Sequence, residues 1–292
     1  MSSRKSLEKA IGRIGDLPAI PEVVSQVLQL TEDSNVALAD VSKVIERDPA
    51  LTAKLLKVSN SPYYGMKQVV GTLKLALVIL GAREVRNIVL GVSVVDSLRD
   101  KTTERFFEHM DFWNHSAMVG GLAKKAGTRF NLGLQGEDFI SGLLHDIGKI
   151  VMWRQIGRPY EALLAGAGGH SAALIEAEKE AYDFDHADAA AVLAHKWNLP
   201  DTLGDALYYH HPREGQSLGD AKDPKLAALV QIANQAAHDN WAAEDKMSLI
   251  SCANDAAWNV LFDNKKVMEL DDRVSLLSGY HTELANAPAP VF

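Results

Sequence analysis

Histidine is the residue type in this 292-residue chain best suited to chemistry near neutral pH, and its positions are uneven. Eight of the ten histidines lie between positions 109 and 211. Among them, His145 and Asp146 are adjacent in the segment GLLHDIGK, which ends at Lys149. An imidazole beside a carboxylate offers the mixed nitrogen and oxygen ligation that divalent metal ions accept. The alternative is a structural role, in which the aspartate caps a helix or orients the imidazole.

Three further segments bring histidine onto expected helices. His115 lies in WNHSAMVGGLAKKAG, His186 begins HADAAAVLAHKW, and His210 and His211 follow LPDTLGDALYY. Together with the His-Asp pair, these side chains could supply six ligands, enough for one octahedral ion or for two ions about 3.5–4 Å apart that share a ligand. Roles other than metal ligation remain open. His186 could be a surface residue that begins a helix, and the His210-His211 pair could be a solvated helix end.

The other histidines have less support from their surroundings. His195, followed by Lys196 and Trp197, is better explained by packing or surface exposure than by ligation. No supporting context is found for the remaining four, which are His109, His170, His238 and His281.

Helices must position these side chains, because apolar residues recur at helical spacing and period-two alternation is nearly absent. The sequence therefore predicts an all-α fold. Early in the chain we expect helices near 21–30, 39–47, 49–59, 72–80 and 82–97. Later helices are expected near 112–128, 136–145, 159–164, 171–182, 186–197, 201–210, 225–238, 247–261 and 270–286.

A charged and poorly periodic stretch before position 109 divides the chain into two parts. We expect an N-terminal helical bundle over residues 1–108, packed on a second helical domain over residues 109–284 that carries the histidines. Residues 285–292, which read ANAPAPVF, are expected to form a short tail rich in proline.

Composition limits the cellular context. The chain has 30 Lys and Arg against 38 Asp and Glu, a formal net charge of −8, which disfavours a sequence-independent grip on nucleic acid. Cys252 is the single cysteine, so no intramolecular disulfide forms and a reducing compartment is expected. The start lacks a signal-peptide core, and charges interrupt the apolar stretch 69–98, so we expect a cytoplasmic protein with no membrane partner.

The order of these motifs resembles the HD superfamily of metal-dependent phosphohydrolases, whose pattern is H…HD…D. His115, the His145-Asp146 pair and Asn234 stand at the corresponding places. The additional His186 and His210-His211 are similar to the extended ligand set of the HD-GYP branch. The segment that follows reads PREGQ, without the GYP signature, so that branch is not supported.

The N-terminal half resembles one relative in particular, the HDOD family ("HD-related output domain"). The segments that carry the resemblance, from about residue 17 to 238, are LPAIPEVVSQVLQL, VIERDPALTAKLLKVSNSPYYG, LGAREVRNIVLG, WNLPDTLGDALYYHH and the dipeptide AN. The family implies an all-helical fold with an HD-like second domain, a bacterial signal-transduction context and, for many members, no established activity.

One departure from the HD pattern concerns its last residue. Asn234 stands where the pattern has an aspartate, and a neutral amide is a poorer ligand for a hard cation. The loss weakens the expected site and its power to activate water. Asp111, one turn before His115, is a possible substitute carboxylate on the same helix face.

Two functions follow as hypotheses. The first is a signalling output module that binds a partner protein or a nucleotide-like small ligand and retains a weakly catalytic or non-catalytic metal site. The second is an active phosphohydrolase on a nucleotide or cyclic dinucleotide, with Asp146 and Lys149 as its catalytic residues. Lys149 is equally explained as a side chain that snorkels from a helix end. One or two divalent ions are expected; the sequence does not discriminate Fe, Mn, Zn, Ni and Mg, and it leaves the oligomeric state open.

Overall fold

The computed structural model describes residues 19–33, 35–98, 112–167, 171–262 and 268–286. Within these ranges the chain forms α-helices joined by short loops and two turns of 3-10 helix, with no strand. The predicted all-α fold is confirmed. Asp111, His109 and His170 lie outside the described residues, as do the predicted boundary at 108/109 and most of the predicted tail.

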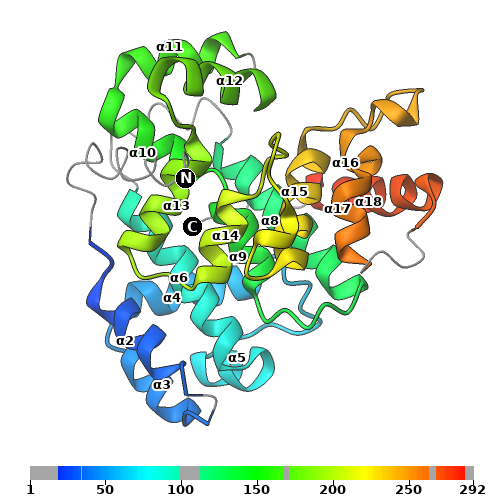
Figure 1. Ribbon diagram of the computed structural model, residues 1–292. Helices are drawn as coiled ribbons and strands as arrows, with labels where there is room; N and C mark the ends of the chain where they lie inside the picture. Colours follow the sequence, from blue (N-terminus) through cyan, green and yellow to red (C-terminus); the bar gives the residue numbers. More distant parts are fainter. Residues whose placement is uncertain (1–18, 34, 99–111, 168–170, 263–267, 287–292) are drawn as a thin grey trace.

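The first five described helices form a bundle at the lower end of the molecule in Figure 1. They are α2 (Glu22–Leu30), α3 (Leu38–Ile45), α4 (Pro49–Ser59), α5 (Leu73–Leu80) and α6 (Ala82–Leu98). Helix α4 begins where the sequence predicts, because the Asp48 carboxylate accepts a hydrogen bond from the Leu51 backbone N–H. Gly81 separates α5 from α6, and its φ of 84° is a conformation that glycine adopts without strain.

The second half of the chain forms the rest of the described molecule (Figure 1). Its long and medium helices are α8 (Phe112–Arg129), α9 (Glu137–Leu144), α10 (Ile147–Ile156), α11 (Arg158–Gly166), α12 (Ser171–Tyr182), α13 (His186–Lys196), α14 (Asp201–Tyr208), α15 (Pro224–His238) and α18 (Leu270–Ala285). The short elements are η1 (Leu218–Asp220), η2 (Lys246–Ser248), α16 (Ile250–Ala253) and α17 (Asp255–Leu261).

Two parts of this half differ from the sequence prediction. Helix α10 is not predicted, because it is apolar on most sides and buried, so it shows no single stripe. The single helix expected over 247–261 is wrong, since the chain there forms η2, α16 and α17. Asn254 divides the last two: its side chain accepts a hydrogen bond from the Ala257 backbone N–H and so begins a new helix.

The two halves share one hydrophobic core. The buried apolar side chains of α2–α6 and those of the second half belong to the same continuous cluster. Helices α8 and α9 cross at two glycines, so closely that a Cβ on Gly142 would lie 2.6 Å from the Gly120 Cα. This close crossing brings the α8 histidine, His115, next to His145 at the end of α9, with ring centroids 5.2 Å apart. None of the described helices combines the length and the apolar character needed to cross a membrane.

Candidate metal centre

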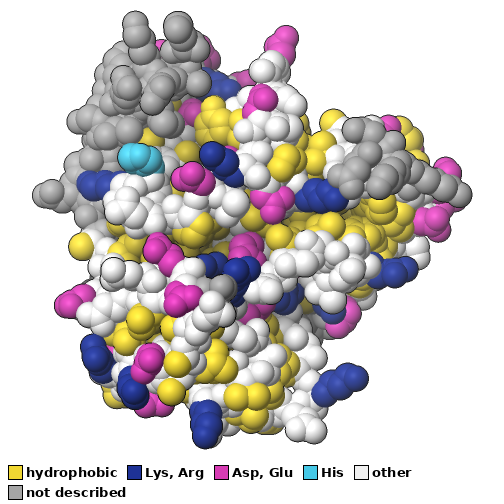
Figure 2. Space-filling view, turned by 60° about the horizontal axis from the view of Figure 1, so that its bottom comes forward, with side chains coloured by type: hydrophobic (Ala, Val, Ile, Leu, Met, Phe, Trp, Pro, Cys, Tyr) yellow, Lys and Arg dark blue, Asp and Glu magenta, His cyan; other side chains and the backbone are white. Residues whose placement is uncertain are grey.

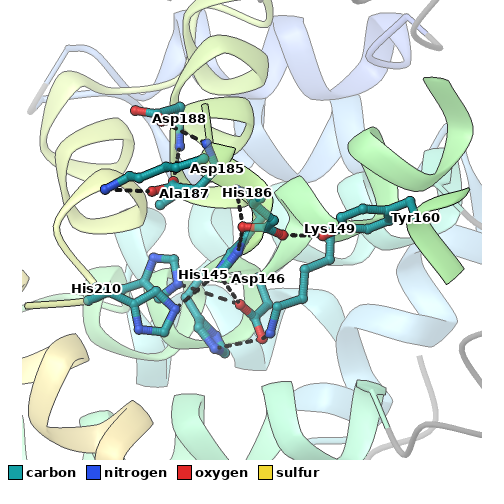
Figure 3. Close-up of polar contacts among 12 residues, drawn as sticks. His145, Asp146, Lys149, Tyr160, Asp185, His186, Ala187, Asp188 and His210 are labelled. Carbon is teal, nitrogen blue, oxygen red and sulfur yellow. Dashed lines mark hydrogen bonds and ion pairs between the residues drawn. The ribbon is translucent and has the colours of Figure 1, made fainter. Parts of the chain in front are cut away.

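Asp146 is the residue around which the predicted ligands gather. It lies between α9 and α10 and is 2% exposed. Figure 3 shows His145, His186 and His210 directed toward its carboxylate, with Lys149 beside it. The nearest approaches to an Asp146 carboxylate oxygen are 2.6 Å for Lys149 Nζ, 3.3 Å for His145 Nε2, 3.4 Å for His186 Nε2, 3.5 Å for His210 Nε2 and 3.9 Å for His115 Nε2.

A glycine allows His186 to reach this position. Helices α10 and α13 pack so closely that a Cβ on Gly148 would lie 1.7 Å from the His186 carbonyl oxygen. No other residue type fits there without moving one of the helices. The start of α13 is fixed in addition by Asp185, whose side chain accepts backbone hydrogen bonds from Ala187 and Asp188. The first residue of α13 is thus held against the residue that precedes α10.

The Nδ1 atoms of three histidines are engaged by acceptors. His145 donates to the Gly142 carbonyl at 2.7 Å, and His210 donates to the Leu207 carbonyl at 2.6 Å. His186 donates to a Glu178 carboxylate oxygen at 2.7 Å. A neutral imidazole with its proton on Nδ1 presents a lone pair at Nε2. Each of these rings therefore turns a metal-binding atom toward Asp146.

Burial keeps much of the cluster uncharged around an ionised carboxylate. Burial lowers the pKa of His210 to about 3, despite the neighbouring Asp146 carboxylate. Burial also holds the pKa values of His115 and His211 well below the usual value, and neighbouring histidines add to the effect. For Asp146 burial alone would raise the pKa, but the neighbouring His145 and the Lys149 ammonium hold it well below its usual value.

This arrangement fits a divalent cation. His145 Nε2, His210 Nε2 and Asp146 Oδ1 are buried without a hydrogen-bond partner, and lone pairs that face a carboxylate need a positive charge between them. Two sets of ligand atoms each lie within 4.8 Å of one another and share the aspartate: Asp146, His186, His210 and His211, and His115, His145 and Asp146. Either set could hold an ion, and Asp146 could bridge two.

Two of the alternatives to metal ligation are wrong, namely the surface position of His186 and the solvated helix end at His210 and His211. His186 is fully buried rather than on the surface, and His210 and His211 are 0% and 4% exposed rather than solvated. These last two lie just past the end of α14, which is two residues shorter than predicted. The His211 Nε2 lies 3.0 Å from the His186 Nε2, so the two rings converge on one point. His195 is exposed, as expected for a residue outside the site.

Asn234 joins the site at its edge. Its Oδ1 lies 3.2 Å from the His115 Nε2, and Asn234 belongs to neither set of clustered ligand atoms. An amide in this place can orient the ring but adds no negative charge. His238, one turn further along α15, lies against the same ring at 4.3 Å between centroids. Sequence reasoning gave His238 no context, so this neighbour was missed, although its i+4 spacing from Asn234 was a usable signal.

Glu178 and Tyr160 are the functional candidates that sequence reasoning missed altogether. Both are fully buried, and one Glu178 oxygen accepts from the backbone N–H and the Nδ1 of His186. The other oxygen accepts from the Tyr160 hydroxyl (Figure 3). Burial and Glu178 hold the pKa of Tyr160 well above its usual value, so the hydroxyl stays a donor. Glu178 lies in the charged run EAEKEAY, which is typical of a solvated helix and gives no sign of this role.

Lys149 lies at the partly open side of the cluster. Its ammonium donates to Asp146 Oδ2 and its side chain is 13% exposed. The helical spacing of three residues from Asp146 explains the contact. The snorkelling interpretation does not describe it fully, because the ammonium is paired with the central carboxylate.

Comparison with known proteins finds a matching family. Residues 17–212 match the HDOD domain family. An uncharacterized protein of Treponema pallidum (strain Nichols) is 28% identical over 203 residues, which are 68% of this chain and 38% of that protein. This chain therefore spans well under half of that relative.

Two solved structures have similar folds. An HDOD domain protein of unknown function from Geobacter sulfurreducens is 20% identical, with a TM-score of 0.74 over 97% of each chain. A protein from Shewanella amazonensis SB2B, described as a candidate phosphohydrolase, is 26% identical, with a TM-score of 0.70 over 96% of each chain. The family match covers most of the chain, from the N-terminal bundle to the last of the clustered histidines. The chain belongs to the HDOD family.

Proposed function

We propose that this protein is a bacterial signalling output module that acts in the cytoplasm and holds a divalent metal ion at the Asp146 cluster. The observation that carries the proposal is the set of buried, unpartnered ligand atoms that face one another across Asp146. A cluster of lone pairs around a carboxylate is unfavourable without a cation and favourable with one. His115, His145, Asp146, His186, His210 and His211 would hold the metal, with Asn234 at its margin.

Two features favour a regulatory rather than a strongly catalytic role. Asn234 brings a neutral amide to the place of an anionic ligand, so the site should hold a hard divalent ion less tightly. The ligands of the four-residue set are also at most 4% exposed. Only His115 and Lys149, at 17% and 13%, give the described cluster partial access to solvent. A small ion fits this site better than a bulky substrate does.

Phosphohydrolysis is the second candidate, supported by one specific feature. Lys149 places an ammonium at the more open side of the cluster, where it could neutralise charge on a phosphate ester of a nucleotide-like ligand. A bound divalent ion would supply polarisation of a phosphoryl oxygen and a lower pKa for attacking water. The structure from Shewanella amazonensis, described as a candidate phosphohydrolase, favours the same reaction class.

The deciding experiment measures metal and turnover on the same preparation. Protein purified without added metal is analysed by elemental mass spectrometry, then supplied with Mn²⁺ or Fe²⁺ and tested against phosphomonoesters and nucleotide phosphodiesters. We expect about one to two ions per chain and no turnover above that of an Asp146→Ala variant. Turnover that Asp146→Ala abolishes would establish the hydrolase instead.

A matched variant separates loss of metal from loss of fold. Asp138→Asn changes another buried aspartate, on α9 away from the ligand atoms, and should retain the wild-type metal content. If the wild-type protein binds no ion under any of these conditions, both metal-centred functions are excluded.

A further inference from the structure

The face of α5 that points away from the core is unusually apolar. Val78 and Ile79 are 65% and 49% exposed, and Leu75, on the same helical face, is 39% exposed. Val69, in the loop before α5, is 81% exposed. The opposite face of α5 is buried against α3, α4 and α6 through Leu73, Ala76 and Leu77. These exposed side chains are therefore not needed for packing within the described chain.

The same region carries an unbalanced positive charge. Residues 49–83 contain five Lys and Arg and no Asp or Glu, in a chain whose net charge is −8. Lys67, Lys74 and Arg83 are exposed and form no ion pair among the described residues. Figure 2, in which the N-terminal bundle comes forward, shows hydrophobic side chains open to solvent in its lower part, with Lys and Arg at the margin and some Asp and Glu to one side. We call Val69, Leu75, Val78, Ile79, Lys67, Lys74 and Arg83 the α5 surface.

We propose that the α5 surface docks an acidic, amphipathic segment of a partner protein. Contiguous exposed apolar side chains mark interaction sites, and unpaired cations at their edge select a partner of opposite charge. Leu75, Val78 and Ile79 follow the i, i+3, i+4 spacing, so they present one ridge along a little more than one turn of helix. An acidic segment with apolar side chains at helical spacing matches both properties.

A protein segment fits this surface better than an anionic membrane. Recognition of anionic lipid typically needs clusters of about four to eight Lys and Arg, whereas the α5 surface offers three unpaired cations. The net charge of −8 also repels an anionic bilayer as the whole molecule approaches it. The surface lies on the N-terminal bundle, whereas the Asp146 cluster lies among α10, α13 and α14 (Figure 1), and the proposal does not depend on the metal.

The test uses the full chain and a defined probe. A fluorescent synthetic peptide of about 18 residues, about five helical turns, carries Leu on one helical face and Glu on the other; a second peptide has Lys in place of every Glu. Fluorescence anisotropy should show binding of the Glu peptide at least about tenfold tighter than that of the Lys peptide. Val78→Asp should weaken the Glu peptide by at least about tenfold, and Lys74→Glu should reduce the preference for it.

The matched control is Met247→Asp. Met247 is 63% exposed, much like Val78, but lies in η2 in the second half, so this variant should bind the Glu peptide like wild type. Circular dichroism and metal content unchanged in all variants would show that they fold. Equal binding of the two peptides, or an equal loss in Met247→Asp, would overturn the proposal.

Two further outcomes would assign the surface to another occupant and so also overturn it. One is sedimentation with phosphatidylglycerol vesicles that Val78→Asp abolishes while peptide binding is absent. The other is concentration-dependent self-association in analytical ultracentrifugation that Val78→Asp abolishes, which would make the occupant a second copy of this chain.

Discussion

Two aspartates eight residues apart are buried to the same extent and have opposite electrostatic surroundings. Asp146 and Asp138 are each 2% exposed. Burial raises the pKa of Asp138 to about 6, and the ammonium of Lys124, which also pairs with Glu84, offsets only part of this rise. Asp146 has a pKa held well below its usual value by the His and Lys groups around it. The first carboxylate is destabilised as an anion, and the second is prepared to remain one.

The difference teaches that burial alone does not identify a metal ligand. At Asp138, a hydrogen bond from the Phe139 backbone N–H and the shared Lys124 satisfy the carboxylate at the contact between α6, α8 and α9. At Asp146, one oxygen has no hydrogen-bond partner although imidazole nitrogens surround it. The first site is a closed structural cluster. The second has buried oxygen and nitrogen atoms without a hydrogen-bond partner, and these atoms could coordinate a cation.

The two sites also predict opposite responses to acid in the metal-free protein. The raised pKa of Asp138 gives a stabilising contribution that is complete below about pH 3.8 and is lost as pH rises through about 6. The lowered pKa values of His115, His210 and His211 act the other way: the unfolded chain takes up protons below about pH 6.5 that the folded chain does not. Three histidines outweigh one aspartate, so unfolding becomes easier as pH falls below about 6.5.

The largest expected effect comes from neutralising the shared ligand. Asp146→Asn keeps the shape of the side chain but removes the charge common to both ligand sets. Because loss of a supporting partner already costs about 10–100-fold in metal affinity, loss of this ligand should cost more than about 100-fold. Isothermal titration of metal-stripped protein with Mn²⁺ or Zn²⁺ measures the change. Asp138→Asn, the same chemical change in the other site, should leave the affinity within about twofold; equal losses would remove the distinction between the two aspartates.

Asp138→Asn should instead change stability. The variant cannot ionise, so it avoids a cost of at most about 3 kcal/mol that the wild type bears above its pKa of about 6. Its free energy of unfolding in urea should exceed that of wild type at pH 7.5, and the two should converge toward pH 4. A variant that is less stable than wild type at pH 7.5 would show that the ion pair with Lys124 dominates over burial.

Glu178→Gln tests whether the hydrogen bond from His186 Nδ1 to Glu178 helps the candidate metal centre to bind an ion. A Gln at this position can present its amide nitrogen to His186 and no longer fixes the ring with Nδ1 as donor. Metal affinity should fall by about 10–100-fold, with a smaller loss for Tyr160→Phe, which removes only the hydroxyl bond to Glu178. Glu176→Gln, on the exposed side of the same helix, is the control and should bind metal like wild type. Unchanged affinity in Glu178→Gln would make this carboxylate a purely structural partner.

The sequence predicted which side chains gather around Asp146 better than it predicted the residues that support them. Residue type and helix spacing singled out His145, Asp146 and His186 as candidate ligands, and the structure brings these three side chains together. Glu178 was missed, since a carboxylate in a charged helix looks solvated until tertiary packing buries it. Helix α10 was not predicted because its residues are buried on several sides, so the sequence shows no amphipathic stripe there. Contacts between residues far apart in the sequence bury both Glu178 and α10, and helical periodicity in the sequence does not reveal such contacts.

Lys149→Gln should give the smallest effect on the metal and the clearest view of function. The ammonium competes with a cation for Asp146 Oδ2, so its removal should leave metal affinity unchanged or raise it by a few fold, about 1 kcal/mol or less after screening. Lys196→Gln, at the exposed end of α13, controls for the lost charge. Under the regulatory proposal, phosphoesterase assays with Mn²⁺ give no turnover in wild type or in either variant. Turnover in wild type that Lys149→Gln alone removes, with metal still bound, would place Lys149 on the substrate and make the centre catalytic.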